Sequence, residues 1–378
     1  MRISTIKLSS FRNFAKKELL FLDGVNVIVG PNASGKTNIL EAIHLLSTGK
    51  SFRAGVEGEM VSHSAEIARI AGKVDSGKMS AIGLEVVLSR GKIEIDKEKI
   101  QKIPKKRLLV NNVARRLIDF AGNFKTVLFG PWDMDLVNGP PALRRNFLDS
   151  VLSQVDREYR RSTLSYEKGL RQRNKILWDL REVSGFGEVG RERLHFWDKL
   201  LIKNGNYLGE RRQEFVDFCN REIKSQQLMS NGFSLQYDKS AISEGRLEEY
   251  EKQEVAAAQT LVGPHRDNFT FRVKEQGSKR AGERNLATYG SRGETRMGIL
   301  WLKMQELNFI KEKTLVNPVL LLDDIFSELD HEHRDAVMGI LKEHQTPLRQ
   351  GYVGQAIITT ADEHFVENLP QSSIINLK

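Results

Sequence analysis

Eight consecutive residues constrain the fold of this chain more than any other stretch. They match the pattern G-x-x-x-x-G-K-[ST] at every fixed position and read Gly30-Pro31-Asn32-Ala33-Ser34-Gly35-Lys36-Thr37. The β-branched run 25–29 precedes them and predicts a strand, and residues 38–46 follow with apolar side chains at helical spacing. A strand, a glycine-rich loop and a helix in this order predict a loop that binds nucleotide phosphates. The alternative is a glycine turn before an unrelated helix.

The residue types of this loop suit a triphosphate. Gly30 and Gly35 let the backbone bend and approach a phosphate closely, while the loop amides and the helix N-terminus converge on the anion. We expect all eight residues to bind ATP. Lys36 would reach the β- and γ-phosphates and take part in catalysis, and Thr37 would hold Mg²⁺ through its hydroxyl.

A pair of carboxylates lies near the other end of the chain. The apolar run 319–322 predicts a buried strand, which ends in Asp323 and Asp324. A carboxylate at the end of a core strand can hold Mg²⁺, and the next one can polarise the attacking water. We therefore assign Asp323 to the metal and Asp324 to the water. Taken alone, these residues would also fit a strand that ends in an ordinary acidic loop.

The distance between the two motifs predicts the domain organisation. Lys36 and Asp323 are 287 positions apart (323 − 36). Both ends of the chain must therefore combine into one α/β ATPase core, and the middle must be an inserted, mainly helical lobe. We expect an N-terminal half of the core at 1–140, an inserted helical arm at 141–262 and a C-terminal half at 263–378.

Secondary structure is predicted around this framework. The N-terminal part reads as two strands, 2–8 and 19–29, joined by a loop that holds Arg12, and residues 66–96 read as an antiparallel meander. The basic run 97–107 reads as a solvated loop or as a track for a phosphate backbone, because Pro104 disfavours regular structure. Helices are expected over 142–181, 191–224, 244–261 and 291–313, and a last strand over 355–360.

The balance of charge points to an anionic partner. The chain of 378 residues carries a net charge of +9, and nucleic acid is the commonest partner of such chains; a basic surface without a particular ligand is the alternative. Cys219 is the single cysteine, which fits a reducing cytoplasm, and no apolar run is long enough to span a bilayer. As DNA-phosphate contacts we propose Arg144, Arg145, Lys105 and Lys106.

The stretch 291–294 has two compatible interpretations. As a capping box it starts a helix, because the hydroxyl of Ser291 caps the backbone and Glu294 reaches back. As an S-x-G-E signature, formed by Ser291, Gly293 and Glu294, it presents a helix N-terminus to a γ-phosphate held by another subunit. Residues 327–330 follow the two aspartates at the spacing of a D-loop. Together these features predict two chains that sandwich two ATP molecules, so that dimerisation depends on ATP.

These motifs together resemble the RecF family, within the ABC-type ATPase heads that include the SMC proteins. The resemblance implies an α/β, ABC-type P-loop ATPase head with discontinuous halves and an inserted helical lobe, and it makes Arg12 a nucleotide contact. The matching pieces span nearly the whole chain and lie at 11–14, 30–37, 50–53, 130–133, 143–149, 263–267, 320–324 and 327–330.

For function, the resemblance implies an ATP- and Mg²⁺-dependent DNA-binding protein of recombinational DNA repair and replication. Such a protein would form a homodimer on ATP and clamp double-stranded DNA near single-strand/double-strand junctions. It would help recombination mediator proteins to load a recombinase, and weak, DNA-stimulated ATP hydrolysis would drive release. The implied location is the cytoplasm, at the nucleoid and away from membranes.

Three other functions are compared with this one. An ABC transporter subunit would carry a switch histidine after the last strand, where Thr359 and Thr360 stand as the switch residues here. An ATP-dependent nuclease with a similar head would need a further metal-carboxylate cluster, for which only the region after Thr360 remains. A small-molecule kinase would not need the serine signature. In this chain the signature reads Ser-Arg-Gly-Glu-Thr-Arg, whereas RecF-like chains more often carry glutamines after the glycine.

Overall fold

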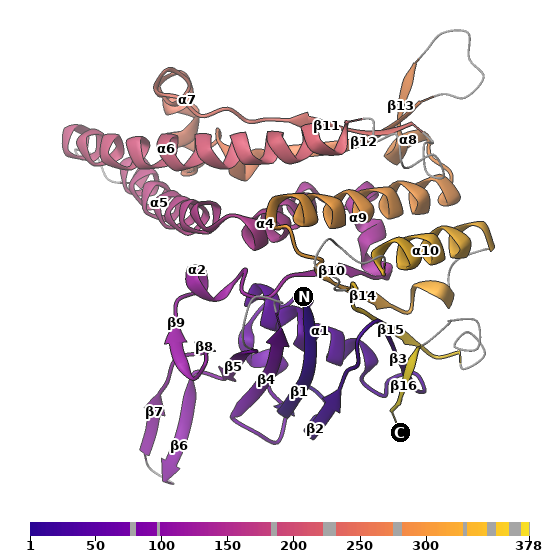
Figure 1. Ribbon diagram of the computed structural model, residues 1–378. Helices are drawn as coiled ribbons and strands as arrows, with labels where there is room; N and C mark the ends of the chain where they lie inside the picture. The colour runs from indigo at the N-terminus through magenta and orange to yellow at the C-terminus, as the bar shows by residue number, and fades with distance from the viewer. Residues whose placement is uncertain are drawn as a thin grey trace. The chain divides into compact units, whose positions relative to one another are not determined.

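The structure of the protein is a computed structural model with two compact units (Figure 1). The first unit comprises residues 1–133 and 303–378, and the second comprises residues 134–302. The second unit extends past the expected boundary at 262/263, because β11 (Phe233–Asp238) of the insertion pairs antiparallel with β12 (Asn268–Lys274). The described residues are 1–75, 81–96, 99–182, 187–221, 232–274, 282–327, 331–345, 353–362 and 372–377.

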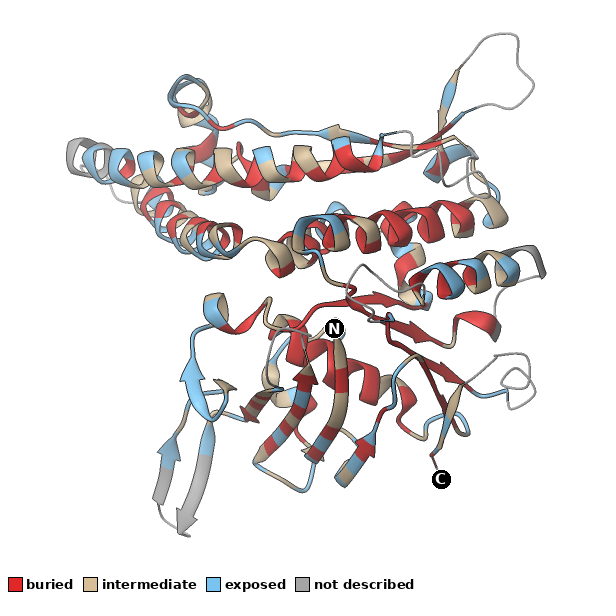
Figure 2. Ribbon diagram, viewed as in Figure 1, coloured by how far each residue is buried: buried red, intermediate tan, exposed pale blue. Residues whose placement is uncertain are grey.

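A five-stranded parallel sheet joins the two ends of the chain in the first unit. All residues of its three central strands are buried and most of them are aliphatic, as expected where both faces of a parallel sheet are covered (Figure 2). The prediction that both chain ends combine into one α/β core is confirmed. In sheet order the strands are β10 (Thr126–Phe129), β14 (Val319–Asp323), β15 (Ala356–Thr360), β3 (Val25–Val29) and β16 (Ser373–Asn376).

A second, antiparallel sheet of six strands completes the first unit. It contains the first two strands of the meander expected over 66–96, whereas the third strand lies in a separate hairpin. In sheet order the strands are β2 (Phe14–Leu20), β1 (Arg2–Phe11), β4 (Ile67–Asp75), β5 (Ile82–Ser89), β8 (Lys106–Val110) and β9 (Val113–Arg115). A separate two-stranded hairpin consists of β6 (Lys92–Asp96) and β7 (Lys99–Lys102). The remaining elements of this unit are α1 (Lys36–Thr48), α2 (Leu117–Phe120), α10 (His331–His344) and the short 3₁₀ turns 57–60, 131–134 and 325–327.

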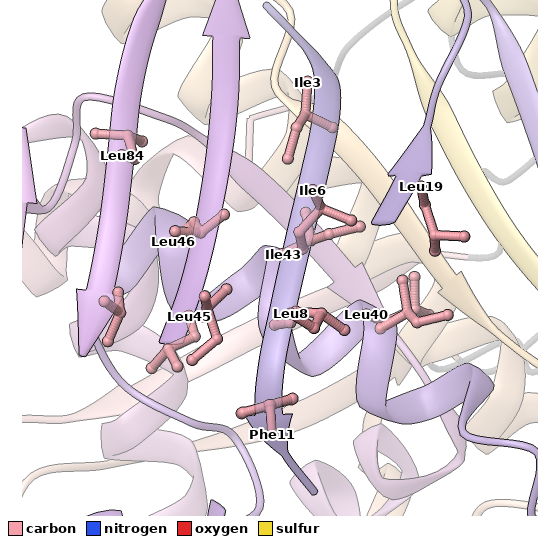
Figure 3. Close-up of a cluster of buried hydrophobic side chains, with 14 of the residues drawn as sticks. Ile3, Ile6, Leu8, Phe11, Leu19, Leu40, Ile43, Leu45, Leu46 and Leu84 are labelled. Carbon is pink, nitrogen blue, oxygen red and sulfur yellow. The ribbon is translucent and has the colours of Figure 1, made fainter. Parts of the chain in front are cut away.

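Helix α1 packs against both sheets and lies at the centre of the core. Leu40, Ile43 and Leu46 of α1 face the side chains of Ile6 and Leu8 on β1 (Figure 3). The same cluster includes residues of the parallel sheet, so α1 is buried on nearly all sides. A helix in this position cannot shift without disturbing both sheets. The start of α1 is therefore held firmly in place.

The second unit is mainly helical. Its two longest helices form an antiparallel pair, in which Gly169 of α5 packs against Leu200 of α6. The helical pattern expected over 142–181 is two helices, because the carboxylate of Asp156 accepts hydrogen bonds from the backbone N–H groups of Glu158 and Tyr159 and caps a new helix. The helices are α3 (Asp135–Asn138), α4 (Pro141–Val155), α5 (Arg157–Glu182), α6 (Gly187–Cys219), α7 (Glu244–Ala257), α8 (Leu286–Tyr289) and α9 (Arg292–Thr314). Strand β13 (Glu283–Asn285) pairs with β12 and completes a three-stranded sheet in the order β11-β12-β13.

Several local predictions were wrong. The expected loop before the second strand is a tight hairpin, in which β1 continues to Phe11 and only Arg12 and Asn13 separate it from β2. The basic run 97–107 holds strands β7 and β8, with Pro104 in the link between them, so the proline breaks the chain at a strand boundary rather than preventing strands. The strand at 355–360 is not the last one, since β16 follows and pairs with β3.

Buried histidines predict how the stability of the fold depends on pH. Burial, together with the nearby charge of Lys303, lowers the pKa of His44 to about 4. Its Nδ1 lies 3.2 Å from Thr126 Oγ1. Below pH 6.5 the unfolded chain binds a proton at this site that the folded protein does not, so stability is full above pH 6.5 and falls toward pH 4. Between pH 6.5 and 5 we expect this histidine to contribute about 2 kcal/mol to the loss.

Urea unfolding at several pH values tests this expectation. His44→Gln keeps a polar group near Thr126 but cannot titrate, so its stability should fall less steeply between pH 6.5 and 5 than that of the wild type. Equal slopes for both proteins would show that His44 does not carry the acid sensitivity.

Candidate functional site

The loop 30–35 connects the end of β3 to the start of α1 and curls around the side chain of Lys36. Lys36 is only 7% exposed, and its Nζ donates hydrogen bonds to Gly30 O at 2.7 Å and Pro31 O at 3.0 Å. Ala33 and Gly35 both have left-handed backbones, with φ of 67° and 101°. Such a backbone turns successive N–H groups inward and makes a concave site for an anion.

The hairpin turn before β2 packs directly on this loop. A Cβ placed at Gly35 would lie 2.6 Å from Phe14 Cζ and 2.8 Å from the side-chain amide of Asn13. Asn13 also donates a hydrogen bond to Ser34 O. Gly35 is therefore required both by its positive φ and by lack of space. The motif 11–14, which the sequence placed beside the loop only by resemblance, is its packing partner.

The three central parallel strands bring the carboxylate motif to the same edge. Asp323 is the last residue of β14 and is paired in register with Thr359 of β15. Strand β15 in turn pairs with β3, the strand that leads into the phosphate loop. Thr37 Oγ1 donates to Asp323 Oδ2 at 2.8 Å, and Thr359 Oγ1 donates to Asp323 Oδ1 at 2.7 Å. Both carboxylate oxygens of Asp323 are thus held, in the position where open α/β sheets bind ligands.

Asp324 has an unusual backbone. Its φ is 47°, in the left-handed region, and its N–H points back to Thr359, 3.1 Å from Oγ1 and 3.2 Å from the carbonyl oxygen. Aspartate and asparagine tolerate this conformation better than most residues. The strand therefore ends sharply at this point. Thr360 lies further along β15, and its Oγ1 accepts a hydrogen bond of 3.0 Å from Asp362 N.

The residues of this edge suit a nucleotide with Mg²⁺. Thr37 and Asp323 supply a hydroxyl and a carboxylate oxygen in mutual contact, and Mg²⁺ prefers oxygen ligands. Ser34 Oγ is buried and has no hydrogen-bond partner among the described residues. A buried hydroxyl is rarely left unpaired, so an acceptor such as a phosphate oxygen would satisfy it. The donor set therefore fits both groups.

Arg12, the expected nucleotide contact, is held by a carboxylate of α1. Its guanidinium donates to both carboxylate oxygens of Glu41, at 2.8 and 2.6 Å, and to Glu59 O. Ser51 and Arg53 donate to the same carboxylate. Burial raises the pKa of Glu41, but the hydrogen bonds from Arg12 and Ser51 and the charge of Arg53 outweigh it and hold the pKa below its ordinary value.

Sequence reasoning missed Glu41. The available signal was a carboxylate in the middle of a helix that is otherwise buried and apolar, since such a charge needs a cationic partner. Arg12 lies near the phosphate loop because its neighbour Asn13 is hydrogen-bonded to Ser34 O of that loop. The guanidinium of Arg12, however, donates its hydrogen bonds to Glu41 and Glu59. Its contact with the nucleotide therefore stays a prediction.

In the second unit, the stretch 291–294 forms the capping box that the sequence suggested. Glu294 N donates to Ser291 Oγ at 3.1 Å, and Ser291 N donates to Glu294 Oε2 at 2.8 Å. Arg284 forms an ion pair with the same glutamate. The hydrogen bond from Ser291 N is the main reason that the pKa of Glu294 lies below its ordinary value. Ser291 itself is exposed and Gly293 is half-buried. In the D-loop, residues 328–330 lie outside the described residues.

The four proposed DNA contacts differ sharply in exposure. Arg144 is buried and donates hydrogen bonds to Asn268 Oδ1 and to the carbonyl oxygens of residues 136 and 139. It therefore stabilises the second unit and is a poor candidate for a contact with DNA phosphate. Arg145 is half-buried and donates to Asp267 O. Lys106 forms an ion pair of 2.9 Å with Glu57. Lys105 alone is exposed.

Comparison with known proteins identifies the family. The model of the RecF/RecN/SMC N-terminal domain matches residues 2–377. A DNA replication and repair protein RecF of Roseiflexus castenholzii is 36% identical over 90% of this chain and 91% of its own length. One from Lactococcus lactis is 32% identical over 98% of this chain and 96% of its own. The chain belongs to the RecF family.

Solved structures agree with this assignment. The recombination mediator protein RecF with ATP, from the RecFOR pathway, superposes with a TM-score of 0.80 at 29% identity and covers 96% of this chain and 92% of that one. The Smc head domain of Pyrococcus yayanosii, at 13% identity, shares the fold, with a TM-score of 0.53 over 99% of this chain and 94% of that one. The expected fold, an α/β ATPase head of the type shared by RecF and SMC proteins, is confirmed.

One piece of the RecF resemblance has a structural explanation. Asp267, in the stretch 263–267, is fully buried and accepts hydrogen bonds from Arg212 Nη1 at 2.8 Å, from the hydroxyl of Tyr237 and from Ser240 N. Arg212 also pairs with Asp149, which belongs to the matching stretch 143–149. These two RecF-like stretches are joined through one buried arginine that sequence reasoning did not single out. Their role in this unit is to hold the helices together.

Two observations bear on the competing functions. In the part of the chain that the structure describes, none of the helices combines the length and hydrophobicity needed to cross a bilayer. Over the same residues, we find no group of three or more His, Cys, Asp or Glu side chains arranged to hold a metal. Of the region after Thr360, residues 363–371 and 378 lie outside the described part.

Proposed function

We propose that this chain is an ATP-dependent DNA-binding protein of DNA replication and recombinational repair. The observation that carries the proposal is the hydrogen bond of 2.8 Å between Thr37 and Asp323, which joins a phosphate loop from one end of the chain to a carboxylate from the other. The RecF relatives, which are named as DNA replication and repair proteins, and the solved RecF structure with ATP support the same assignment.

In the proposed site, the backbone of the loop and Lys36 hold the phosphates of ATP, and Thr37 and Asp323 hold Mg²⁺. The metal, when bound, neutralises charge on the phosphates. Thr359 keeps the Asp323 carboxylate oriented through its 2.7 Å hydrogen bond, which gives the residue at the switch position a positioning role. Asp324 orients the attacking water. Hydrolysis is weak, is stimulated by DNA, and resets the protein.

The finer part of the proposal concerns assembly. Two copies pair when ATP is bound, and the pair clamps double-stranded DNA near a junction with a single strand. There it assists mediator proteins in loading a recombinase, and hydrolysis releases it. Pairing through ATP is favoured by the start of α9, because Ser291 is exposed there and the N-terminus of a helix attracts an anion.

The test of this proposal compares the wild-type protein with and without ATP. Sedimentation should show a monomer without ATP and a dimer with it, and binding to a gapped duplex should tighten at least about tenfold under the same condition. Duplex binding and dimerisation that are indifferent to ATP would refute the clamp.

Ser291→Arg should block ATP-driven pairing and leave ATP binding by the monomer within about twofold. The arginine puts a bulky side chain where we expect the partner's γ-phosphate, while Ser291 is exposed in the monomer. The substitution also removes a helix cap, worth about 1 kcal/mol. Ser291→Asn, which keeps the cap, is therefore the matched control and should still pair. Normal dimerisation of the arginine variant would reduce Ser291 to a helix cap.

A further inference from the structure

The net positive charge of the chain is concentrated in one segment of the first unit. Residues 90–116 contain ten basic and three acidic residues, a net charge of +7 against +9 for the whole chain. The segment forms the β6–β7 hairpin and the strands β8 and β9, and β9 is the free edge of the six-stranded sheet (Figure 1). All three residues of β9 are exposed (Figure 2). The charge therefore lies on the surface.

Three lysines gather at the foot of the β6–β7 hairpin. Lys92 of β6 stands directly opposite Lys102 of β7 in the antiparallel register. A Cβ placed at Gly91 would lie 3.4 Å from Lys105 Cγ and 3.5 Å from its Cε, so the Lys105 side chain runs over the residue next to Lys92. All three lysines are exposed. We call Lys92, Lys102 and Lys105 the lysine triad.

The register gives these lysines like-charged neighbours. Equal charges directly opposite each other destabilise an antiparallel pair, so the register that places Lys92 opposite Lys102 has a cost that a bound anion would offset. Next to the triad, Lys106 forms an ion pair with Glu57, whose carboxylate also interacts electrostatically with Lys105. Two like charges held opposite each other, with a third cation beside them, favour an anion that comes from outside the chain.

We propose that the lysine triad binds the phosphate backbone of duplex DNA. Lysine acts on phosphate as a point charge and reads no base edge, so the contact is independent of sequence. The exposed Arg107 and Arg115 extend the basic surface along β8 and β9, which suits a polymer of phosphates better than a single small anion. This inference rests on the proposed function and names the surface through which the DNA is held.

Salt-dependent DNA binding tests the triad. A variant with Lys92→Ala, Lys102→Ala and Lys105→Ala should bind a gapped duplex at least about tenfold more weakly in the presence of ATP. The slope of log K against log salt should become shallower by about 3, since each lost phosphate contact removes about 0.9. ATP binding should be unchanged, because the triad is distinct from the residues that form the phosphate loop.

The matched control removes the same charge from the other side of the same sheet. Lys16 and Lys17 lie on β2, its opposite edge, and Lys73 lies on β4. The triple alanine variant of these residues should keep the wild-type affinity and salt slope. If both triple variants bind DNA like the wild type, or weaken equally, the triad is not the DNA surface. If the wild type itself fails to bind duplex DNA with ATP, the proposed function fails instead.

Discussion

Lys36→Ala is expected to lower the affinity for ATP at least about 100-fold and to abolish ATP-dependent DNA binding. A charged hydrogen bond to a phosphate contributes about 1.5–3 kcal/mol, and the lysine makes more than one in the proposed site. The side chain is almost fully buried within the loop and already points its Nζ at two loop carbonyls. Alanine removes the cation and leaves those two oxygens without their donor.

Two measurements separate loss of binding from loss of folding. A fluorescent ATP analogue gives the affinity directly, and thermal unfolding with and without ATP shows whether ligand still stabilises the fold. Lys16→Ala, an exposed lysine of β2, is the control for charge alone and should behave like the wild type. A Lys36→Ala protein that still binds ATP normally would mean that the loop holds no triphosphate, however closely it fits the pattern.

The sequence predicted the loop, the strand before Asp323 and their meeting at one edge of the sheet, because each of these motifs is local. The turn at Gly35 and the strand before Asp323 are set by neighbouring residues, and parallel strands must bring their carboxyl ends to one edge. The split of the core followed from the separation of the two motifs alone. These features needed no knowledge of which distant side chains meet.

The failures have the opposite character. The ion pair between Arg12 and Glu41 was not foreseen, because Glu41 stands 29 positions away on a helix that is mostly buried and apolar. Arg144 was read as a surface cation, although its acceptors, among them Asn268, lie on other segments. A buried arginine and an exposed one look the same in a sequence. Only tertiary contacts decide between them.

Strand errors came from weak patterns. Residues 373–376 alternate between half-buried and exposed positions at the edge of the parallel sheet, and such a short strand is held by pairing with β3 rather than by its own propensity. Pro104 was taken as evidence against strands in the run 97–107, which would hold for a proline inside a strand. Its position between β7 and β8 has no such effect, because neither ladder needs its missing N–H.

Asp324→Asn is expected to slow ATP turnover at least about 100-fold while ATP binding and dimerisation persist. Removing a residue that orients or deprotonates the attacking water typically costs a factor of 10²–10⁴. The amide has the shape of the carboxylate but cannot accept a proton. Losing a negative charge beside the phosphates should, if anything, strengthen ATP binding. The variant should therefore accumulate as an ATP-bound dimer on DNA.

The backbone makes asparagine the right substitution. Asp324 has a φ of 47°, and asparagine shares with aspartate its tolerance of the left-handed region, whereas alanine would add strain at the end of β14. Asp335→Asn on α10, which makes the same change at an exposed position, is the matched control and should hydrolyse ATP like the wild type. Single-turnover hydrolysis, measured beside equilibrium ATP binding, distinguishes the two effects. Unchanged hydrolysis in Asp324→Asn would assign the water to another group, and Asp324 would then serve only to turn the chain after the metal-binding carboxylate.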